Sequence, residues 1–214
     1  MTGKLCKRMF FSFDGTDGVG KSTQIELFKH WLIENGHEVV LCRDPGSSLL
    51  GERLRDLLLD KHDIGIHRRS EMFLYMTART QMVEEVIKPA LALEKTVICD
   101  RYLLANIVYQ GHAGGLDSEV IRQVGEIATD GIMPDLTILL DMDVTNARGR
   151  MDRELDRIES QGLGYMEQVR QGFLREAARA SDSIKVVDAS RDIATIHEEI
   201  VSLALAFLKK ERGV

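Results

Sequence analysis

The stretch Gly15-Thr16-Asp17-Gly18-Val19-Gly20-Lys21-Ser22 matches the pattern G-x-x-x-x-G-K-[ST] at every fixed position. It follows an apolar run at residues 9–13 and precedes a segment of helical character. A phosphate chain needs backbone N–H groups turned inward, so glycines line such a loop, and the next helix N-terminus favours negative charge. The stretch is typical of a phosphate-binding loop (P-loop), in which Lys21 reaches the β- and γ-phosphates and Ser22 offers a hydroxyl to Mg²⁺. The alternative is a glycine-rich turn with an unrelated lysine.

The rest of the chain alternates short β-rich runs with longer amphipathic ones. This alternation predicts an α/β fold, a five-stranded parallel sheet with helices on both faces. We expect strands near residues 8–14, 37–43, 96–100, 135–142 and 184–188. We expect helices near residues 21–35, 48–60, 68–94, 117–130, 143–156, 164–180 and 193–210. Pro89 should kink or end the third of these helices near Lys88.

Length and composition indicate one soluble domain. The 214 residues suit a single domain spanning 1–214, and no change in composition marks a linker. A formal net charge of −6 argues against a nucleic-acid polymer as partner, and no segment approaches membrane-spanning length. Cys6, Cys42 and Cys99 cannot all pair and have no C-x-x-C spacing. Because Cys42 and Cys99 fall in strand-like runs, we expect buried, reduced thiols in a cytoplasmic protein.

Charged residues follow the ends of the expected strands. In open parallel sheets, ligands bind at the carboxyl ends of the strands. The segments at those ends are the P-loop, residues 43–46, residues 100–102 and residues 141–157, and together they offer more anion-binding groups than ATP alone requires. Arg79 lies one helical turn after Tyr75 in an otherwise apolar stripe. Sequence alone leaves it open whether Arg79 is a site residue or a surface charge with a buried stem.

Five short motifs follow one another along the chain. They are F-D-G-T-D-G-V-G-K-S-T-Q at 13–24, R-D-P-G at 43–46, A-R-T-Q at 78–81, D-R-Y at 100–102 with Y-Q-G at 109–111, and E-L-D-R-I-E at 154–159. This set resembles the thymidylate kinases, a family of P-loop nucleoside monophosphate kinases, from about Phe10 through the C-terminal helix. The resemblance implies a homodimeric, Mg²⁺-dependent enzyme that transfers the γ-phosphoryl group of ATP to dTMP and gives dTDP and ADP for dTTP synthesis.

The resemblance also assigns the phosphate-donor side of the site. The residues implied to bind ATP are Gly15, Thr16, Asp17, Gly18, Val19, Gly20, Lys21, Ser22, Thr23 and Arg148. Mg²⁺ is expected on the Ser22 hydroxyl and, through water, on Asp100 at a strand end. The alternative for Asp100 is a helix-capping or arginine-pairing carboxylate. The residues implied to be catalytic are Lys21, Arg101, Arg150 and Arg153.

On the acceptor side, the residues implied to bind dTMP are Asp17, Arg43, Asp44, Arg55, Tyr75, Arg79, Arg101, Asn106, Tyr109 and Gln110. In the family, residues at these positions contact different parts of the nucleotide. An acidic P-loop residue accepts from the 3′-hydroxyl, arginines hold the phosphate, and an aromatic ring stacks on thymine while the next turn's arginine donates to its carbonyl edge. The position of Tyr109 carries a bulky ring that leaves no room for a 2′-hydroxyl. The alternative for Tyr109 is an ordinary core tyrosine.

Residues 147–163 resemble the family's mobile lid, which closes over ATP and excludes water. Without the P-loop, their mixed charges would indicate only a solvated helix face. Family members place an arginine either in the P-loop or in the lid, and here the P-loop position is Gly18. We therefore expect Arg150 and Arg153 of the lid to neutralise the transferring phosphoryl group.

Three positions depart from the family pattern: Tyr75 replaces a phenylalanine, Asp44 a glutamate and Ala105 a common serine. These departures keep two other functions open. The chain is alternatively a kinase of another (deoxy)nucleoside monophosphate or of a deoxynucleoside, or else a nucleotide-binding regulator without catalysis. His112, in a glycine-rich stretch, is expected at the surface and not in catalysis. The adenine contacts near residues 189–191 are left unassigned.

Overall fold

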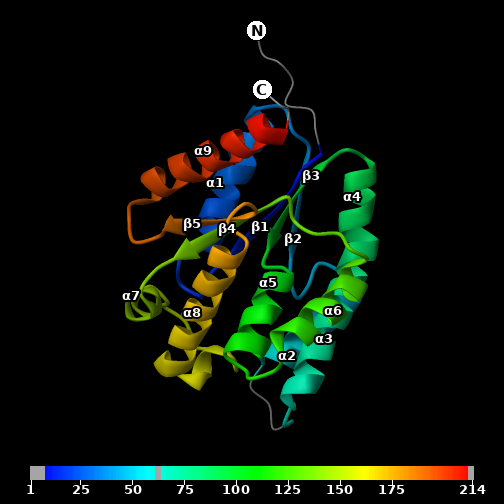
Figure 1. The fold of residues 1–214 in the computed structure, drawn as a ribbon, viewed down its shortest axis with the longest axis vertical. Coiled ribbons are helices and arrows are strands. Elements are labelled where there is room, and N and C mark those ends of the chain that lie inside the picture. Colours follow the sequence, from blue (N-terminus) through cyan, green and yellow to red (C-terminus); the bar gives the residue numbers. More distant parts are fainter. Residues whose placement is uncertain (1–7, 61–63, 212–214) are drawn as a thin grey trace.

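The computed structural model describes residues 8–60 and 64–211, the last two without their side chains. Its centre is a parallel sheet in the order β2-β3-β1-β4-β5 (Figure 1). The strands are β1 (Phe10–Asp14), β2 (Val39–Arg43), β3 (Thr96–Asp100), β4 (Leu136–Asp141) and β5 (Ile184–Asp188). The predicted five-stranded α/β fold is confirmed, although β1, β2 and β4 are each two residues shorter than expected.

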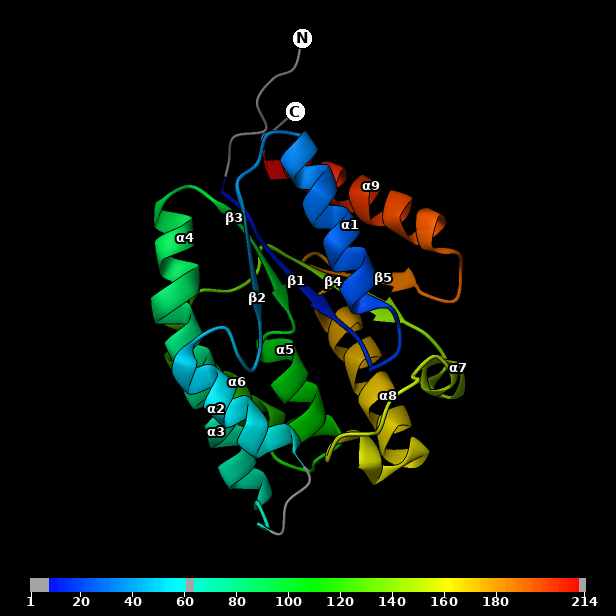
Figure 2. The same cartoon turned by 180° about the vertical axis from the view of Figure 1, so that it is seen from behind.

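Helices cover both faces of the sheet because successive strand residues point to opposite sides. On one face, Phe11 and Phe13 pack against Phe28 of α1 (Lys21–Glu34), and α9 (Ile193–Glu211) lies beside α1 (Figure 2). On the other face, Phe10 packs edge-on against Tyr102, with ring centroids 5.0 Å apart. The predicted lack of polar alternation in the central strands follows from this double coverage.

The second face of the sheet is covered by a larger group of helices. They are α3 (Arg68–Met82), α4 (Lys88–Ala92), α5 (Leu103–Asn106), α6 (Ser118–Thr129) and α8 (Leu163–Arg179). Helix α2 (Leu49–Leu59) packs on α3, at the end of the sheet where the strands finish (Figure 1). Its first turn is capped by Ser48, whose hydroxyl accepts from the N–H of Gly51.

The long helix expected at 68–94 is divided. A π-helical segment, η1 (Val83–Ile87), separates α3 from α4, and the helix ends at Ala92. Pro89 has no N–H and its ring displaces the carbonyl four residues earlier, so the chain widens into a π-helical turn just before it. The predicted disruption near Lys88 is thus confirmed, as a π-helical segment.

Two sequence expectations about helices were wrong. The helix expected at 143–156 stops early, because α7 (Val144–Gly149) is followed by irregular backbone and a short 3₁₀ turn, η3 (Glu159–Gln161). The side chains of 150–159 find partners outside a helix: Arg153 bonds Glu159, and Asp156 accepts from the N–H groups of Ile158 and Glu159. The second error is an omission, since α5 and the π-helical η2 (Ile107–His112) were not anticipated at all.

Other expectations concern single residues and termini. Cys42 and Cys99 are buried free thiols, as predicted, and Cys6 lies outside the described residues. His112 is half-buried and its Nε2 lies 2.7 Å from Glu176 Oε1, so it is not the simple surface residue expected. Among helices of the described ranges, none combines the length and apolar character needed to cross a bilayer.

Candidate active site

The P-loop joins β1 to α1 through backbone conformations that require glycine. Gly15 has φ +133°, and a Cβ there would lie 2.3 Å from the carbonyl oxygen of Leu140. Gly18 has φ +86°, and its Cβ would lie 2.1 Å from the carbonyl oxygen of Ala147 at the start of the lid. Because both contacts are with backbone, neither residue can carry a side chain. The structure thus leaves no space for an arginine at Gly18.

Lys21 is buried in the cradle of this loop. Its Nζ donates to the carbonyls of Thr16 at 2.8 Å and Gly15 at 3.1 Å, and lies 3.6 Å from Asp17 Oδ1. Burial and the neighbouring Arg101 guanidinium lower the pKa of Lys21. Ser22 and Thr23 are exposed in the first turn of the helix. An ammonium group and a hydroxyl are therefore presented where a phosphate chain enters the loop.

Arg101 links the end of β3 to the P-loop. Its backbone is left-handed, with φ +67°, which turns the side chain over the loop. Its Nη2 donates to Asp17 Oδ1 at 2.6 Å, its Nη1 donates to the Gly15 carbonyl at 2.7 Å, and the guanidinium lies over the Tyr109 ring. Burial opposes ionisation of Asp17, but the charges of Arg101 and Lys21 prevail and lower the pKa of the carboxyl. This ion pair forms a charged junction in the middle of the site.

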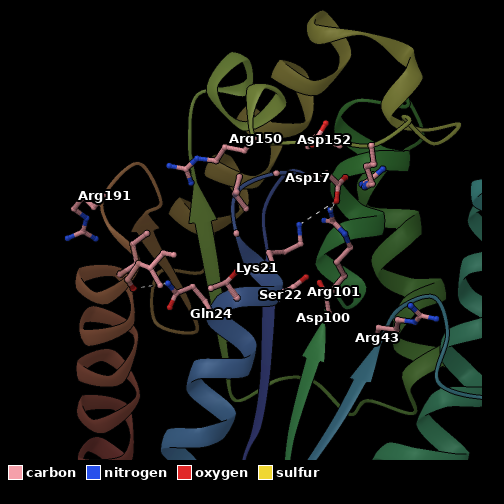
Figure 3. Close-up of a pocket in the computed structure, with 18 of the residues that line it drawn as sticks. Asp17, Lys21, Ser22, Gln24, Arg43, Asp100, Arg101, Arg150, Asp152 and Arg191 are labelled. Carbon is pink, nitrogen blue, oxygen red and sulfur yellow. Dashed lines mark hydrogen bonds and ion pairs between the residues drawn. The ribbon is translucent and has the colours of Figure 1, made fainter.

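A wide cleft of about 1160 Å³ opens over the P-loop, and we call it the donor cleft. Arg150 and Arg191 lie on one side of the loop and Arg43 on the other, with Ser22 and Asp100 between them (Figure 3). All four residues expected to be catalytic line this cleft, as do both expected metal ligands. Of the residues expected to bind ATP, those at 17–23 line it, whereas Gly15, Thr16 and Arg148 do not.

Arg148 lies in α7 and lines a different cavity. With Thr16 it lines a separate apolar cavity between the P-loop, α7 and α8. Sequence reasoning also missed several residues of the donor cleft: Gln24, Met151, Asp152, Arg191, Asp192, Ile193, Ala194 and Ile196. Gln24 holds the far wall, since its Nε2 donates to the carbonyl of Ile193 at 2.9 Å. Gln24 could have been noticed in the sequence, because it is the last residue of the first motif.

Asp100 and Ser22 fit a magnesium ion. Oδ1 of Asp100 is buried and has no hydrogen-bond partner among the described residues, and both side chains line the donor cleft. The part of the chain that the structure describes holds no group of three or more His, Cys, Asp or Glu suited to a metal ion. Mg²⁺ is commonly held by one or two protein oxygens together with substrate phosphates and water, so this sparse donor set suits it.

Asp14, the last residue of β1, is a functional candidate that sequence reasoning missed. It is completely buried, and neither carboxylate oxygen has a hydrogen-bond partner among the described residues. Burial raises the pKa of Asp14 to about 7, although the charges of Arg101 and Lys21 oppose the increase. The only signal was an acidic residue directly before Gly15. It does not line the donor cleft.

A second, narrower pocket lies beside the donor cleft, and we call it the acceptor pocket. The residues that were expected to bind dTMP and that line this pocket are Asp17, Asp44, Arg55, Tyr75, Arg79, Arg101, Asn106, Tyr109 and Gln110. The remaining predicted residue, Arg43, is exposed, lines the donor cleft instead, and bonds Glu52 at 2.6 Å. Residues that were not predicted also line the acceptor pocket: Pro45, Leu59, Ala105, Asp156 and Ile158.

Arg79 is a site residue and not a surface charge, because it is almost fully buried in this pocket. Its Nε donates to Asp44 Oδ2 at 2.5 Å, its Nη2 donates to Asn106 Oδ1, and its Nη1 contacts Met76 Sδ. Its Nη2 also lies 2.5 Å from Asp44 Oδ2, so the same carboxylate oxygen pairs with two nitrogens of the guanidinium. Burial raises the pKa of Asp44, against the opposing charge of Arg79. The 2.5 Å distance shows that Asp44, although shorter than the glutamate usual in the family, still reaches Arg79.

The lid segment extends along both pockets. Arg150 and Arg153 face the donor cleft, whereas Asp156 and Ile158 line the acceptor pocket. Arg150 Nη1 donates to the carbonyl of Ala189 at 3.2 Å. Arg153 forms a two-bond pair with Glu159, which raises the pKa of the guanidinium. The lid thus meets both cavities through separate side chains.

A P-loop under a wide cleft, with a second pocket across a charged junction, defines a P-loop enzyme of the nucleotide kinase class. The sequence model of the thymidylate kinase family matches residues 13–200. The thymidylate kinase of Rhodopirellula baltica is 45% identical over 194 residues, covering 91% of this chain and 79% of the relative. That of Kosmotoga olearia is 41% identical over 204 residues, covering 94% and 98%.

A solved structure agrees with the sequence relatives. The crystal structure of thymidylate kinase from Ehrlichia chaffeensis is similar with a TM-score of 0.75 and 31% identity, covering 92% of this chain and 99% of that one. This chain therefore belongs to the thymidylate kinase family, the ATP-dependent dTMP kinases. Nothing in these comparisons favours another nucleotide kinase or a regulator without catalysis.

Proposed function

We propose that the donor cleft binds ATP, the acceptor pocket binds dTMP, and the γ-phosphoryl group passes between them to give ADP and dTDP. One observation carries this division of roles. Asp17, Asp44, Arg55 and Arg101 line both cavities, so the two substrates would meet at a shared junction of two carboxylates and two guanidiniums. Phosphoryl transfer needs the attacking and leaving oxygens in line, and two cavities that share one junction support this proposal.

The protein's part in the reaction is mainly electrostatic. Lys21 and Arg101 would balance the negative charges of the two phosphates, and the lid arginines would add charge when the segment closes and excludes water. No side chain has to act as a strong base, because a phosphate oxygen of dTMP is already the nucleophile. Ser22 and, through water, Asp100 would hold Mg²⁺, which supplies further charge neutralisation on the ATP phosphates.

Base recognition would depend on Tyr75 and Arg79, one helical turn apart in α3. The Tyr75 ring would stack on thymine while Arg79 donates to a carbonyl oxygen. The amino group of cytosine would meet Arg79 donor to donor, so dCMP should be a poor acceptor.

Tyr75→Ala should weaken dTMP binding by roughly 1 to 3 kcal/mol, whereas Tyr75→Phe should be tolerated. Binding and turnover of dTMP and dCMP by the three proteins test this; efficient dCMP phosphorylation or a harmless Tyr75→Ala would show that the pocket is misassigned.

Tyr109 would exclude ribonucleotides. Its ring lies between Arg101 and Phe173, with the hydroxyl 3.4 Å from Asp17 Oδ2, so it is both a core residue and a wall of the acceptor pocket. Tyr109→Ala should raise the activity on ribo-TMP relative to dTMP, because removal of a clash helps only the larger sugar. The kcat/KM ratio of the two acceptors measures this. An unchanged ratio would place the steric wall elsewhere.

We also propose a homodimer. Large apolar side chains are exposed on neighbouring helices of one layer: Leu49 on α2, Phe73 on α3, and Val120 and Ile127 on α6. Leu49 is 91% and Ile127 82% exposed, which is a cost unless a partner covers them. Sedimentation that gives only the 24.1 kDa monomer would refute the dimer.

The free, buried thiols of Cys42 and Cys99 support a reducing, cytoplasmic setting.

A further inference from the structure

Glu71 of α3 is a completely buried carboxylate that lines neither the donor cleft nor the acceptor pocket. It nevertheless contacts residues of both the pocket and the lid. Its Oε1 accepts from Gln110 Nε2 at 2.9 Å and from Arg68 Nη1 at 3.4 Å, and its Oε2 accepts from Arg157 Nη2 at 2.5 Å. A buried charge of this kind is costly unless it is paired, and here three donors satisfy it.

The contact with Gln110 sets the orientation of a chain of amides. Asn106 Nδ2 donates to Gln110 Oε1 at 2.7 Å, and Asn106 Oδ1 accepts from Arg79. A carboxylate only accepts and a guanidinium only donates, so each end of the chain dictates the same direction for both amides. If residue 71 could also donate a hydrogen bond, the Gln110 amide could turn round. The amino group of Gln110 would then face the amino group of Asn106, and neither could accept from the other.

The contact with Arg157 holds the lid where it borders the acceptor pocket. The backbone N–H of Arg157 donates to the carbonyl of Leu59, and its Nε donates to the carbonyl of Leu58, both in the last turn of α2. The residues on either side of Arg157, Asp156 and Ile158, line the acceptor pocket. Glu71 therefore joins the pocket amides to the part of the lid that lines the same pocket.

We propose that Glu71 is a positioning residue that sets base selectivity: it holds Gln110 and Asn106 in the orientation that recognises the pyrimidine and ties that arrangement to the lid through Arg157. The proposal rests on the assignment of the acceptor pocket to dTMP. Glu71 touches no substrate in this account and acts entirely through its neighbours. It thus extends the recognition site beyond the residues that line the pocket.

The test is a double-mutant cycle with Glu71→Gln and Gln110→Ala. Glu71→Gln should raise KM for dTMP by about tenfold and lower the preference for dTMP over dCMP, because the amide chain loses its fixed direction. In the Gln110→Ala background the same change should have little further effect on this preference, since residues acting through one another are not additive. Isothermal titration with dTMP gives a readout that does not depend on turnover.

Glu176→Gln is the matched control. Glu176 is also buried and paired, with Arg122 and His112 each at 2.7 Å, but it lies outside both pockets. It should lower thermal stability without changing KM or selectivity. If Glu71→Gln does not fold, Glu71→Asp, which withdraws the carboxylate by one methylene, replaces it with the same expectations. Unchanged dTMP affinity and selectivity in a folded Glu71 variant would overturn the proposal, whereas failure of the wild type to use dTMP would instead overturn the pocket assignment.

Discussion

Lys21→Ala is expected to lower the turnover of dTMP at saturating substrates by at least about a hundredfold, the scale for losing a preorganised charge at a developing negative charge. The reason is the position of Lys21 within the P-loop, buried and donating to the carbonyls of Gly15 and Thr16. When ATP binds, the ammonium would exchange these carbonyls for phosphate oxygens, whose charge grows during transfer. Alanine leaves the loop glycines intact, so the loss should appear in kcat more than in folding.

The measurement is steady-state formation of dTDP by the purified variant, with the thermal unfolding midpoint as a check on folding. Lys29→Ala is a suitable control, because Lys29 lies on the same helix, pairs with Glu26 and lines neither pocket. It should retain normal turnover. Near-normal dTDP formation by Lys21→Ala would refute the role of this lysine.

Replacing Arg150 and Arg153 together by alanine should lower kcat by about a thousandfold, the lower end of the range for arginines that stabilise phosphoryl transfer. Gly18 cannot supply this charge, because the Ala147 carbonyl occupies the space of a side chain there. Both lid arginines line the donor cleft, and Arg153 currently pairs with Glu159, from which closure would have to release it. Affinity for dTMP should change little, since the interaction forms mainly in the transition state.

The two single variants separate the contributions, and Arg175→Ala, an exposed arginine of α8 that lines neither pocket, controls for loss of positive charge. We expect each single variant to lower kcat and the control to be neutral. Full activity in both single variants and in the double variant would mean that the transition-state charge comes from another residue. A large rise in KM for dTMP would instead place these arginines in acceptor binding.

The parts of this molecule that the sequence predicted are those in which a local pattern determines the structure. The P-loop and the strand ends are local motifs, and parallel topology brings strand ends together, so Arg101 and Asp17 meet as expected. Nine of the ten acceptor residues that the family resemblance implied line one pocket. The family expected from the five motifs is confirmed by the comparisons, including a solved structure.

The parts that were missed depend on tertiary contacts. The lid segment has helical composition, yet its charges pair with one another and with α2, so α7 stops at Gly149 and Arg148 points into a separate cavity. The segment at 103–112 is helical because its apolar residues pack between β3, α6 and α8. No local pattern in the sequence indicated this packing, because the segment runs into a glycine-rich stretch. Glu71 gave no signal, and Asp14 gave only its place before Gly15, because burial is what distinguishes both from ordinary acidic residues.

The most direct test of the account is an acceptor panel with the wild-type protein and ATP·Mg²⁺, in which dTMP, dUMP, dCMP, dGMP and thymidine are compared by coupled ADP formation and by analysis of the products. The account predicts that dTMP has the highest kcat/KM, that dTDP and ADP form in equal amounts, and that thymidine is not phosphorylated. Preference for another acceptor would contradict the assignment of the pocket around Tyr75 and Arg79, and absence of any turnover would contradict the proposed phosphoryl transfer itself.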